Sequence, residues 1–232
     1  MKCISPRFND LIFKKKSMKS KQKFIQFLLA TNSLQFVEFT LKSGRVSPYF
    51  FNLGRLNGGD TLMELGEFYA DCIVEKWGGE FDIVFGPAYK GIPLAVATVF
   101  ALYKNHNLIR RYSANRKEVK THGDASAFLG AEIKSKDRII LVDDVMTTGA
   151  TKYEAVKLLR SLGDVKIQGL VIGLNRLERG ENGKDAVAEF TRETGVPVWS
   201  IITARDVAGY IKHGSAEQTA LLRYLNEYGI SG

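Results

Sequence analysis

The sequence has little of what several protein classes require. Its 232 residues include two cysteines, three histidines and five prolines. So few cysteines exclude the disulfide framework of small secreted domains, and the scattered histidines and cysteines form no zinc-binding constellation. The longest apolar run, residues 92–103, is too short to cross a bilayer and suits a buried helix. With no convincing secretory signal either, we expect a cytoplasmic protein that has no membrane partner and keeps Cys72 as a small core residue.

Positive charge is concentrated at the N-terminus. Residues 1–23 contain eight Lys or Arg and one Asp, so they carry +7 of the net charge of +8 and leave +1 for the other 209 residues. A basic tail without a base-reading motif does not favour nucleic acid as a partner. Met18 offers an alternative start, so we interpret residues 1–17 as a basic extension that can be disordered, and residues 18–232 as a single domain. A targeting or membrane-surface role stays open for the tail.

Apolar patterns alternate between strand and helix along the body of the chain. Strands of a few apolar residues between helices predict an α/β fold with a central, mostly parallel sheet flanked by helices on both faces. Residues 18–60 predict a small hood of one helix and short strands. Ligands bind such sheets at loops that leave the carboxyl ends of strands, here after Phe85, Val142 and Leu174. The predicted helices are 21–31, 61–77, 92–103, 153–162, 184–194 and 216–228, and the predicted strands are 36–40, 48–52, 81–85, 108–112, 138–142, 166–174 and 196–202.

The most informative stretch runs from Ile139 to Thr151. Four apolar residues predict a buried strand, two acids follow it, and a loop with two threonines and a glycine leads into a helix. Backbone N–H groups at a helix start and threonine hydroxyls can cradle a phosphate, whereas carboxylates accept hydrogen bonds from a ribose diol. A lone acid pair would more simply cap the helix, but the whole arrangement favours a ribose 5-phosphate. Its predicted contacts are Asp143, Asp144, Val145, Met146, Thr147, Thr148, Gly149, Ala150 and Thr151.

This stretch resembles the motif with which type I phosphoribosyltransferases bind PRPP (5-phosphoribosyl 1-diphosphate). Three further segments, 39–52, 85–93 and 115–123, resemble those of the orotate phosphoribosyltransferases, in the same order. The resemblance implies the type I phosphoribosyltransferase fold. It also implies transfer of the phosphoribosyl group from PRPP to orotate, which gives orotidine 5′-phosphate and pyrophosphate in pyrimidine biosynthesis. One departure is Ala150, where the family often has a second glycine; its extra methyl is tolerated at a helix start with negative φ.

The resemblance assigns cationic groups to the departing pyrophosphate, whose negative charge the enzyme must stabilise. On composition alone, residues 116–124 would be a solvated charged loop and His122 an incidental surface histidine. Within the family pattern this loop is a lid that closes over the active site of the partner subunit in a homodimer. The predicted pyrophosphate contacts are Tyr89, Lys90, Arg116, Lys117, Lys120 and His122, and the predicted catalytic residues are Lys120, His122, Asp143 and Asp144.

The orotate site also follows from the resemblance, which implies Lys42, Phe50, Phe51, Thr147 and Arg176 as contacts. A guanidinium can pair bidentately with the orotate carboxylate. Neighbours on a strand point to opposite faces, so we expect one of the two phenylalanines to pack into the core. The family's cofactor, Mg²⁺, is expected to be held mainly by substrate oxygens, with no direct protein ligand.

Two rival functions remain open from the sequence. A phosphoribosyltransferase for a purine or another pyrimidine would share the PRPP motif and differ only in the base site. A PRPP-sensing regulator would keep the phosphate loop without transferring anything. The regulator needs neither lid cations nor a base site, so the presence of Lys90, Lys120 and Arg176 favours an enzyme.

Overall fold

The N-terminal part of the structure is a helix followed by short strands. The computed structural model describes residues 20–41, 44–116, 127–146, 149–180 and 183–230, so the predicted extension, residues 1–17, lies outside the described residues. A helix covers residues 20–30. It leads into four two-residue strands, β1 (Leu34–Gln35), β2 (Phe39–Thr40), β3 (Val46–Ser47) and β4 (Phe50–Phe51), and one 3₁₀ turn, η1 (Leu53–Arg55). β1 pairs with β4 and β2 with β3, both antiparallel.

The remainder of the chain is built on a six-stranded sheet. Its strands are β5 (Ile83–Phe85), β6 (Arg111–Asn115), β7 (Phe128–Gly130), β8 (Arg138–Val145), β9 (Lys166–Asn175) and β10 (Val198–Thr203), in the order β10-β9-β8-β5-β6-β7. All neighbours run parallel except β6 and β7. β8 is central and is flanked by β5 and β9, whose carboxyl ends therefore meet at one edge of the sheet.

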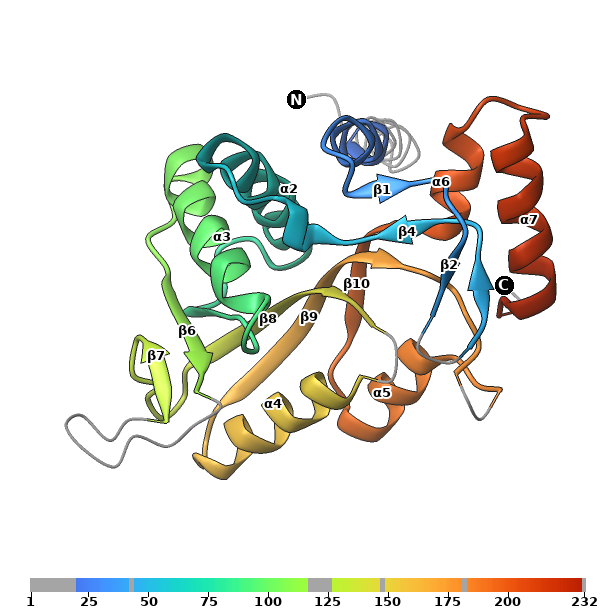
Figure 1. Cartoon of the computed structure of the whole chain (residues 1–232). Coiled ribbons are helices and arrows are strands. Elements are labelled where there is room, and N and C mark those ends of the chain that lie inside the picture. The colour runs from blue at the N-terminus through green and yellow to red at the C-terminus, as the bar shows by residue number, and fades with distance from the viewer. Residues whose placement is uncertain (1–19, 42–43, 117–126, 147–148, 181–182, 231–232) are drawn as a thin grey trace, which may run out of the picture.

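Helices cover both faces of this sheet (Figure 1). The helix over residues 20–30, α2 (Gly59–Trp77), α3 (Gly91–His106), α6 (Ala204–Tyr210) and α7 (Ala216–Tyr228) cover one face, and α4 (Ala150–Ser161) and α5 (Ala186–Thr194) cover the other. The predicted α/β architecture with its mostly parallel sheet is confirmed.

The two faces of β8 lie in two separate hydrophobic clusters. Ile140 and Val142 pack in the cluster under α2 and α3, while Ile139 and Leu141 pack in the cluster under α4 and α5. This is the period of two that a strand buried on both faces must show. The same alternation decides where the next two residues of the strand point, and those residues are the acids of the candidate site.

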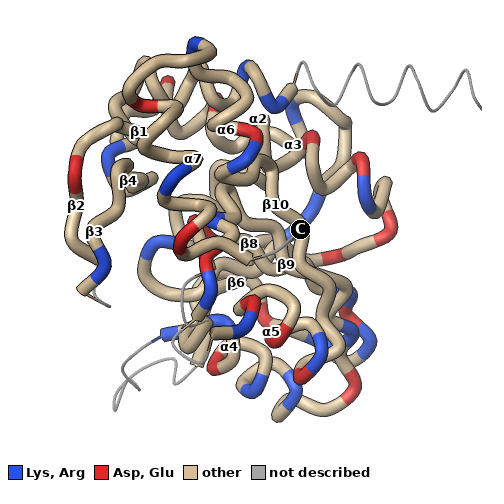
Figure 2. The backbone as a smooth tube through the Cα atoms, turned by 90° about the vertical axis from the view of Figure 1, so that its right-hand side faces the viewer, with Lys and Arg blue, Asp and Glu red and all other residues tan. Residues whose placement is uncertain are grey.

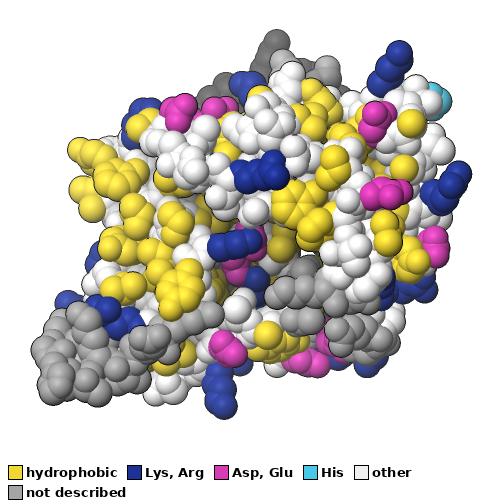
Figure 3. Space-filling model, viewed as in Figure 1, with side chains coloured by type: hydrophobic (Ala, Val, Ile, Leu, Met, Phe, Trp, Pro, Cys, Tyr) yellow, Lys and Arg dark blue, Asp and Glu magenta, His cyan; other side chains and the backbone are white. Residues whose placement is uncertain are grey.

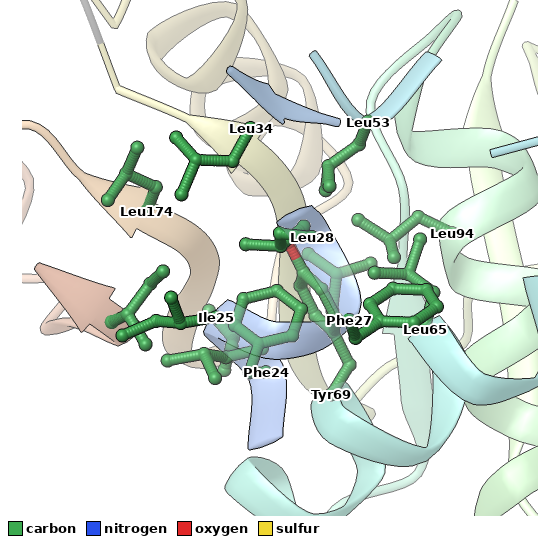
Figure 4. Packing of buried hydrophobic residues seen from close by; sticks show 14 of the residues in the cluster. Phe24, Ile25, Phe27, Leu28, Leu34, Leu53, Leu65, Tyr69, Leu94 and Leu174 are labelled. Atoms are coloured by element: carbon green, nitrogen blue, oxygen red, sulfur yellow. The ribbon is translucent and has the colours of Figure 1, made fainter. Parts of the chain in front are cut away.

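The helix over residues 20–30 belongs to the main core. Phe24 and Leu28 are fully buried, and Figure 4 shows them beside Leu65 and Tyr69 of α2. The Phe24 ring lies 4.8 Å from the ring of Phe68, centroid to centroid. Aromatic packing on the sheet's helix layer therefore anchors the hood, in addition to the buried residues of its short strands.

Charge on the described surface is mixed, because Lys and Arg are interspersed with Asp and Glu along the chain (Figure 2). Among the described residues, no helix is both long and apolar enough to cross a membrane. Cys72 packs against the core, where burial raises the pKa of its thiol to about 12. The prediction of a core cysteine is confirmed.

Four elements of the sheet and its helices differ from the sequence predictions. β6 occupies residues 111–115 rather than 108–112, because Ile109 is exposed and the strand instead pairs through polar residues. The edge strand β7 and the short helix α6 were not predicted at all. The central strand β8 extends to Val145. Asp143 and Asp144 therefore belong to the strand itself, two residues and one residue before its end, and do not follow it.

Candidate functional site

Two carboxylates at the carboxyl end of β8 form the centre of the site. Asp143 Oδ2 lies 2.5 Å from Lys152 Nζ, and its Oδ1 accepts a 2.9 Å hydrogen bond from the backbone N–H of Asp144. Asp144 Oδ2 accepts a 3.0 Å bond from Lys90 Nζ, and its Oδ1 accepts one of 2.7 Å from the N–H of Val145. Each acid therefore has its own lysine, supplied by a different segment of the chain.

The environments of the two acids differ. Asp143 is only 5% exposed. Burial raises the pKa of its carboxyl, and the Lys152 ammonium counteracts that rise. The hydroxyl of Tyr69, itself fully buried, donates a 2.7 Å hydrogen bond to the carbonyl of Asp143 and fixes the backbone there. The Lys90 side chain, in contrast, is 59% exposed, so the partner of Asp144 can turn toward a ligand.

The start of α4 is where the sequence predicts a phosphate cradle. Gly149 has φ of +73°, a left-handed conformation that favours glycine, and it caps the start of α4. Ala150 and Thr151 follow as the first residues of that helix, where N–H groups lack partners within the helix. The extra methyl of Ala150 stands in a helical conformation, as predicted. Of the other predicted contacts, Thr147 and Thr148 lie outside the described residues.

Val145 and Met146 point inward. Met146 is 6% exposed and packs in the cluster under α4, while Val145 packs against the opposite cluster. Their side chains serve the core, so only their backbone groups can face a ligand. The PRPP contacts at these two positions stay predictions, and the inward side chains favour contacts through the backbone.

The loop after β5 depends on a close approach of two glycines. A Cβ on Gly86 would lie 1.9 Å from the carbonyl oxygen of Gly91, which starts α3. Nearby, the backbone N–H of Ala88 donates a 2.9 Å hydrogen bond to Oδ1 of Asn115 at the end of β6. This tight turn carries Lys90 to the acids of β8. Tyr89, the other predicted residue, is 65% exposed.

A pocket of about 270 Å³ connects this loop with the start of α4. Arg116 lies at its edge, where its Nε donates a 3.3 Å hydrogen bond to the carbonyl of Phe128. The remaining predicted lid residues, Lys117, Lys120 and His122, lie outside the described residues. The pocket is lined by Pro87, Ala88, Asn115, Arg116, Thr151 and Glu154.

A second polar group lies where β9 ends. Arg176 is 6% exposed, and its guanidinium stands 4.1 Å above the Tyr49 ring. Its Nη2 donates a 2.9 Å bond to Ser47 Oγ and lies 2.7 Å from Glu178 Oε1. Glu178 also accepts a 3.0 Å bond from the Tyr224 hydroxyl, and burial with this carboxylate raises the pKa of that tyrosine to about 12. Arg176 is therefore held rigidly between β3 and the C-terminal helix.

The two predicted phenylalanines point in different directions. Phe51 packs against the main core. Phe50 instead packs against Phe39, with ring centroids 4.7 Å apart and ring planes tilted by 57°, and lies under the guanidinium of Arg55. The expectation that one of the two packs into the core is confirmed, with Phe51 as that residue. The orotate contact of Phe50 stays a prediction. Lys42, the other predicted contact in the hood, lies outside the described residues.

Four residues near the acids were missed by the sequence prediction. Lys152 was missed because an isolated lysine in a helical pattern is normally predicted to be a surface residue. Asn52 and Asn115 stand in the segments that carried the resemblance, but nothing in the sequence indicated that Asn52 would approach Lys90 Nζ, at 3.4 Å. Tyr69 lies in an apolar helical pattern, and its bond to the Asp143 carbonyl depends on tertiary structure.

Comparison with known proteins decides the family. The sequence model of the phosphoribosyl transferase domain matches residues 56–200. The chain belongs to the phosphoribosyltransferase family. The match includes both acids of β8 and their lysines, and it also includes Arg176.

Relatives with high coverage are orotate phosphoribosyltransferases. The chain is 46% identical to that of Saccharophagus degradans, over 92% of this chain and 100% of the relative. It is 39% identical to that of Clostridium acetobutylicum, over 90% and 98%. The crystal structure of the Francisella tularensis orotate phosphoribosyltransferase is similar with a TM-score of 0.79 and 34% identity, and covers 90% of this chain and all of that one. Within the phosphoribosyltransferases, the chain thus groups with the orotate enzymes.

Proposed function

We propose that the chain transfers the 5-phosphoribosyl group of PRPP to orotate and forms orotidine 5′-phosphate and pyrophosphate for pyrimidine biosynthesis in the cytoplasm. The bond from C1 of the ribose to the diphosphate oxygen breaks, and a bond from C1 to the orotate ring nitrogen forms as that nitrogen gives up its proton to the diphosphate or to solvent. The observation that carries the proposal is the grouping of Asp144, Lys90 and the start of α4 at one sheet edge. Those groups match the diol, the diphosphate and the 5-phosphate of one PRPP molecule.

The roles on the PRPP side follow from charge. The first N–H groups of α4, with Thr147 and Thr148, receive the 5-phosphate dianion, because a helix start carries partial positive charge. Asp144 accepts hydrogen bonds from the ribose hydroxyls. Lys90 and Arg116 stabilise the departing diphosphate, which is where negative charge accumulates in the transition state. Tyr89, Lys117, Lys120 and His122 complete that site, the last three from the lid.

The roles on the orotate side follow from the group around Arg176. Its guanidinium is fixed by Glu178 and by the ring of Tyr49, so it is preorganised to receive a planar carboxylate. Phe50 faces outward and offers a ring on which the base can stack. Lys42 and Thr147 supply further polar contacts. These positions favour an acidic pyrimidine over a neutral base.

Mg²⁺ is proposed to arrive with PRPP. The nearest acids, Asp143 and Asp144, are each already paired with a lysine, which leaves PRPP and water oxygens as the main ligands that this hard cation prefers. When bound, it would neutralise charge on the diphosphate as that group departs. Activity measured with increasing EDTA should fall to background and return when Mg²⁺ is restored.

The active unit is proposed to be a homodimer whose lid loops reach the partner's site. An apolar surface supports this proposal: hydrophobic side chains gather over α3 and β6 in Figure 3. On α3, Phe100 is 68% exposed and Tyr103 is 60% exposed. Surfaces of this kind mark association sites. Replacing both with Glu should give a monomer by light scattering and lower turnover, whereas Leu222→Glu, at an exposed position on α7, should change neither.

The deciding experiment is an assay with PRPP, Mg²⁺ and a panel of bases. Orotate should yield orotidine 5′-phosphate and pyrophosphate in equal amounts, and uracil, adenine and hypoxanthine should yield neither. Faster transfer to one of those bases would assign the chain to another phosphoribosyltransferase. Tight PRPP binding without any product would favour a regulator.

A further inference from the structure

The two acids of β8 point to opposite faces of the sheet, and this separates their partners. Residues alternate along a strand, so Asp143 follows Ile139 and Leu141 toward α4, and Asp144 faces the other layer. Lys152, in the first turns of α4, meets Asp143 in the interior, where the two side chains are 8% and 7% exposed. This ion pair therefore ties the end of β8 to the helix that starts at the phosphate turn.

Asp143 has both carboxylate oxygens engaged by the protein. Oδ2 is paired with Lys152 at 2.5 Å, and Oδ1 accepts the N–H of Asp144 at 2.9 Å. Neither partner can leave easily, because one is buried and the other is backbone. Asp144 differs, since its Oδ2 is bound by Lys90, whose exposed side chain can turn away.

We propose that Lys152 is a positioning residue: its buried ion pair with Asp143 holds the end of β8 on α4, so that Asp144 alone presents a carboxylate to the ribose hydroxyls. Lys90 covers that carboxylate in the absence of substrate and turns to the diphosphate when PRPP arrives. The inference rests on the proposed function for the identity of the ligand, PRPP. The positions of Lys152 and Asp143 are independent of it.

Removing the Lys152 charge should make PRPP binding depend on pH. The charged or titratable groups that face Asp143 are Lys152 from α4, Asp144 on β8 with its partner Lys90, and the Tyr69 hydroxyl from α2 at the Asp143 carbonyl. Without Lys152, a buried carboxylate beside Asp144 has no cation of its own and takes up a proton. While it holds that proton, the neutral carboxyl can stay buried and still accept the Asp144 N–H, so the end of β8 is little disturbed. Raising the pH removes the proton and leaves an unpaired buried charge, which displaces the end of β8 and Asp144 with it.

The first test compares Lys152→Met with Lys152→Arg and with Lys157→Met, a change at an exposed lysine of the same helix. PRPP affinity is measured by calorimetry without orotate. Lys152→Met should bind PRPP nearly like wild type near pH 6 and about tenfold more weakly toward about pH 9, where Asp143 loses its proton. Lys152→Arg should restore most of the affinity, and Lys157→Met should follow wild type at every pH. Wild-type affinity and pH dependence in Lys152→Met would overturn the proposal.

The second test separates positioning from loss of fold. In the double variant Asp143→Asn with Lys152→Met, the amide oxygen can still accept the Asp144 N–H and no buried charge is left unpaired. It should recover most of the affinity lost in Lys152→Met and show no pH dependence, whereas Asp144→Asn should stay strongly impaired. A double variant that melts like wild type but binds PRPP as poorly as Asp144→Asn would show that Asp143 contacts ribose itself, and would overturn the assignment.

Measuring PRPP binding and product formation separately distinguishes a failure of this inference from a failure of the proposed function. If wild type binds PRPP but forms no orotidine 5′-phosphate, the function fails while the calorimetric comparison still decides the role of Lys152. If orotidine 5′-phosphate forms and Lys152→Met binds PRPP like wild type at every pH, the function holds and the inference fails.

Discussion

The two halves of the site are built in different ways. The proposed sugar-phosphate half consists of the end of β8, the start of α4 and the loop over residues 86–90. The proposed base half consists of β3, β4 and residues 175–179. The first half comes mainly from one continuous strand-turn-helix and keeps an exposed lysine over its carboxylate. The second half joins Ser47 to Arg176 across the fold and buries its arginine against Tyr49. The first half can therefore exchange the lysine on its carboxylate for a ligand, whereas the second half holds its arginine in one position.

The sharpest way to break this comparison is to remove the carboxylate of Asp144. Asp144→Asn should lower kcat/KM for PRPP by about a hundredfold or more, because the amide carries no charge to support the sugar as positive charge develops on it. Initial rates at saturating orotate measure the effect. Asp164→Asn, an exposed acid in the turn after α4, is the matched control. A loss below a few fold would remove Asp144 from the account.

A change in the base half should act on the other substrate. Arg176→Lys should raise KM for orotate by about tenfold or more and leave KM for PRPP nearly unchanged, because an ammonium cannot pair bidentately or stack like a guanidinium. Arg179→Lys, at an exposed arginine three residues further on, controls for the loss of Arg in this segment. Equal changes in both KM values would contradict the division into two halves.

The close approach of Gly86 to Gly91, in the loop that carries Lys90, should affect the stability of the protein through packing. Gly86→Ala forces a methyl against the carbonyl of Gly91 and should reduce the free energy of unfolding by about 2 kcal/mol, with weaker PRPP binding as the loop shifts. Gly209→Ala on α6 has open space at that position and should be neutral or slightly stabilising. Denaturant titration compares the two. An equally stable Gly86→Ala variant would mean that the loop adapts without strain.

The smallest effect is expected at the N-terminus. A chain that starts at Met18 should keep the melting temperature and turnover of the full chain, because it retains the helix over residues 20–30. Removing residues 1–31 instead takes away Phe24 and Leu28 from the core and should prevent stable folding. Thermal melts and the orotate assay measure the stability and the turnover of both deletion variants. Lost activity in the shorter deletion would give residues 1–17 a role.

The sequence predicted most of the fold because apolar alternation is strong in the central strands. It placed the helix over residues 61–77 within two residues of α2. It failed on β6 because Leu108 and Ile109 suggested an apolar strand three residues too early. It also overlooked α6, although Thr203 and Asp206 form a capping box there. Edge strands such as β7 carry only a weak local signal, since three residues cannot establish a period.

The two halves of the candidate site also differ in how well the sequence predicted them. The predicted phosphate-binding turn between β8 and α4 could be recognised in the sequence, because strand, acids, glycine and helix follow one another within thirteen residues. The base half was predicted by resemblance alone, since no local pattern brings Arg176 to Ser47. Lys152 could not be found from the sequence, because only the fold shows that it is buried and that Asp143 is the acid it meets.

A crystal structure of the chain with PRPP and Mg²⁺ tests the central claim most directly. The account predicts the ribose hydroxyls on Asp144, the 5-phosphate at the start of α4, and Lys90 turned from Asp144 to the diphosphate, with the pair of Lys152 and Asp143 unchanged. PRPP bound elsewhere, or ribose hydroxyls on Asp143 with that ion pair broken, would contradict it.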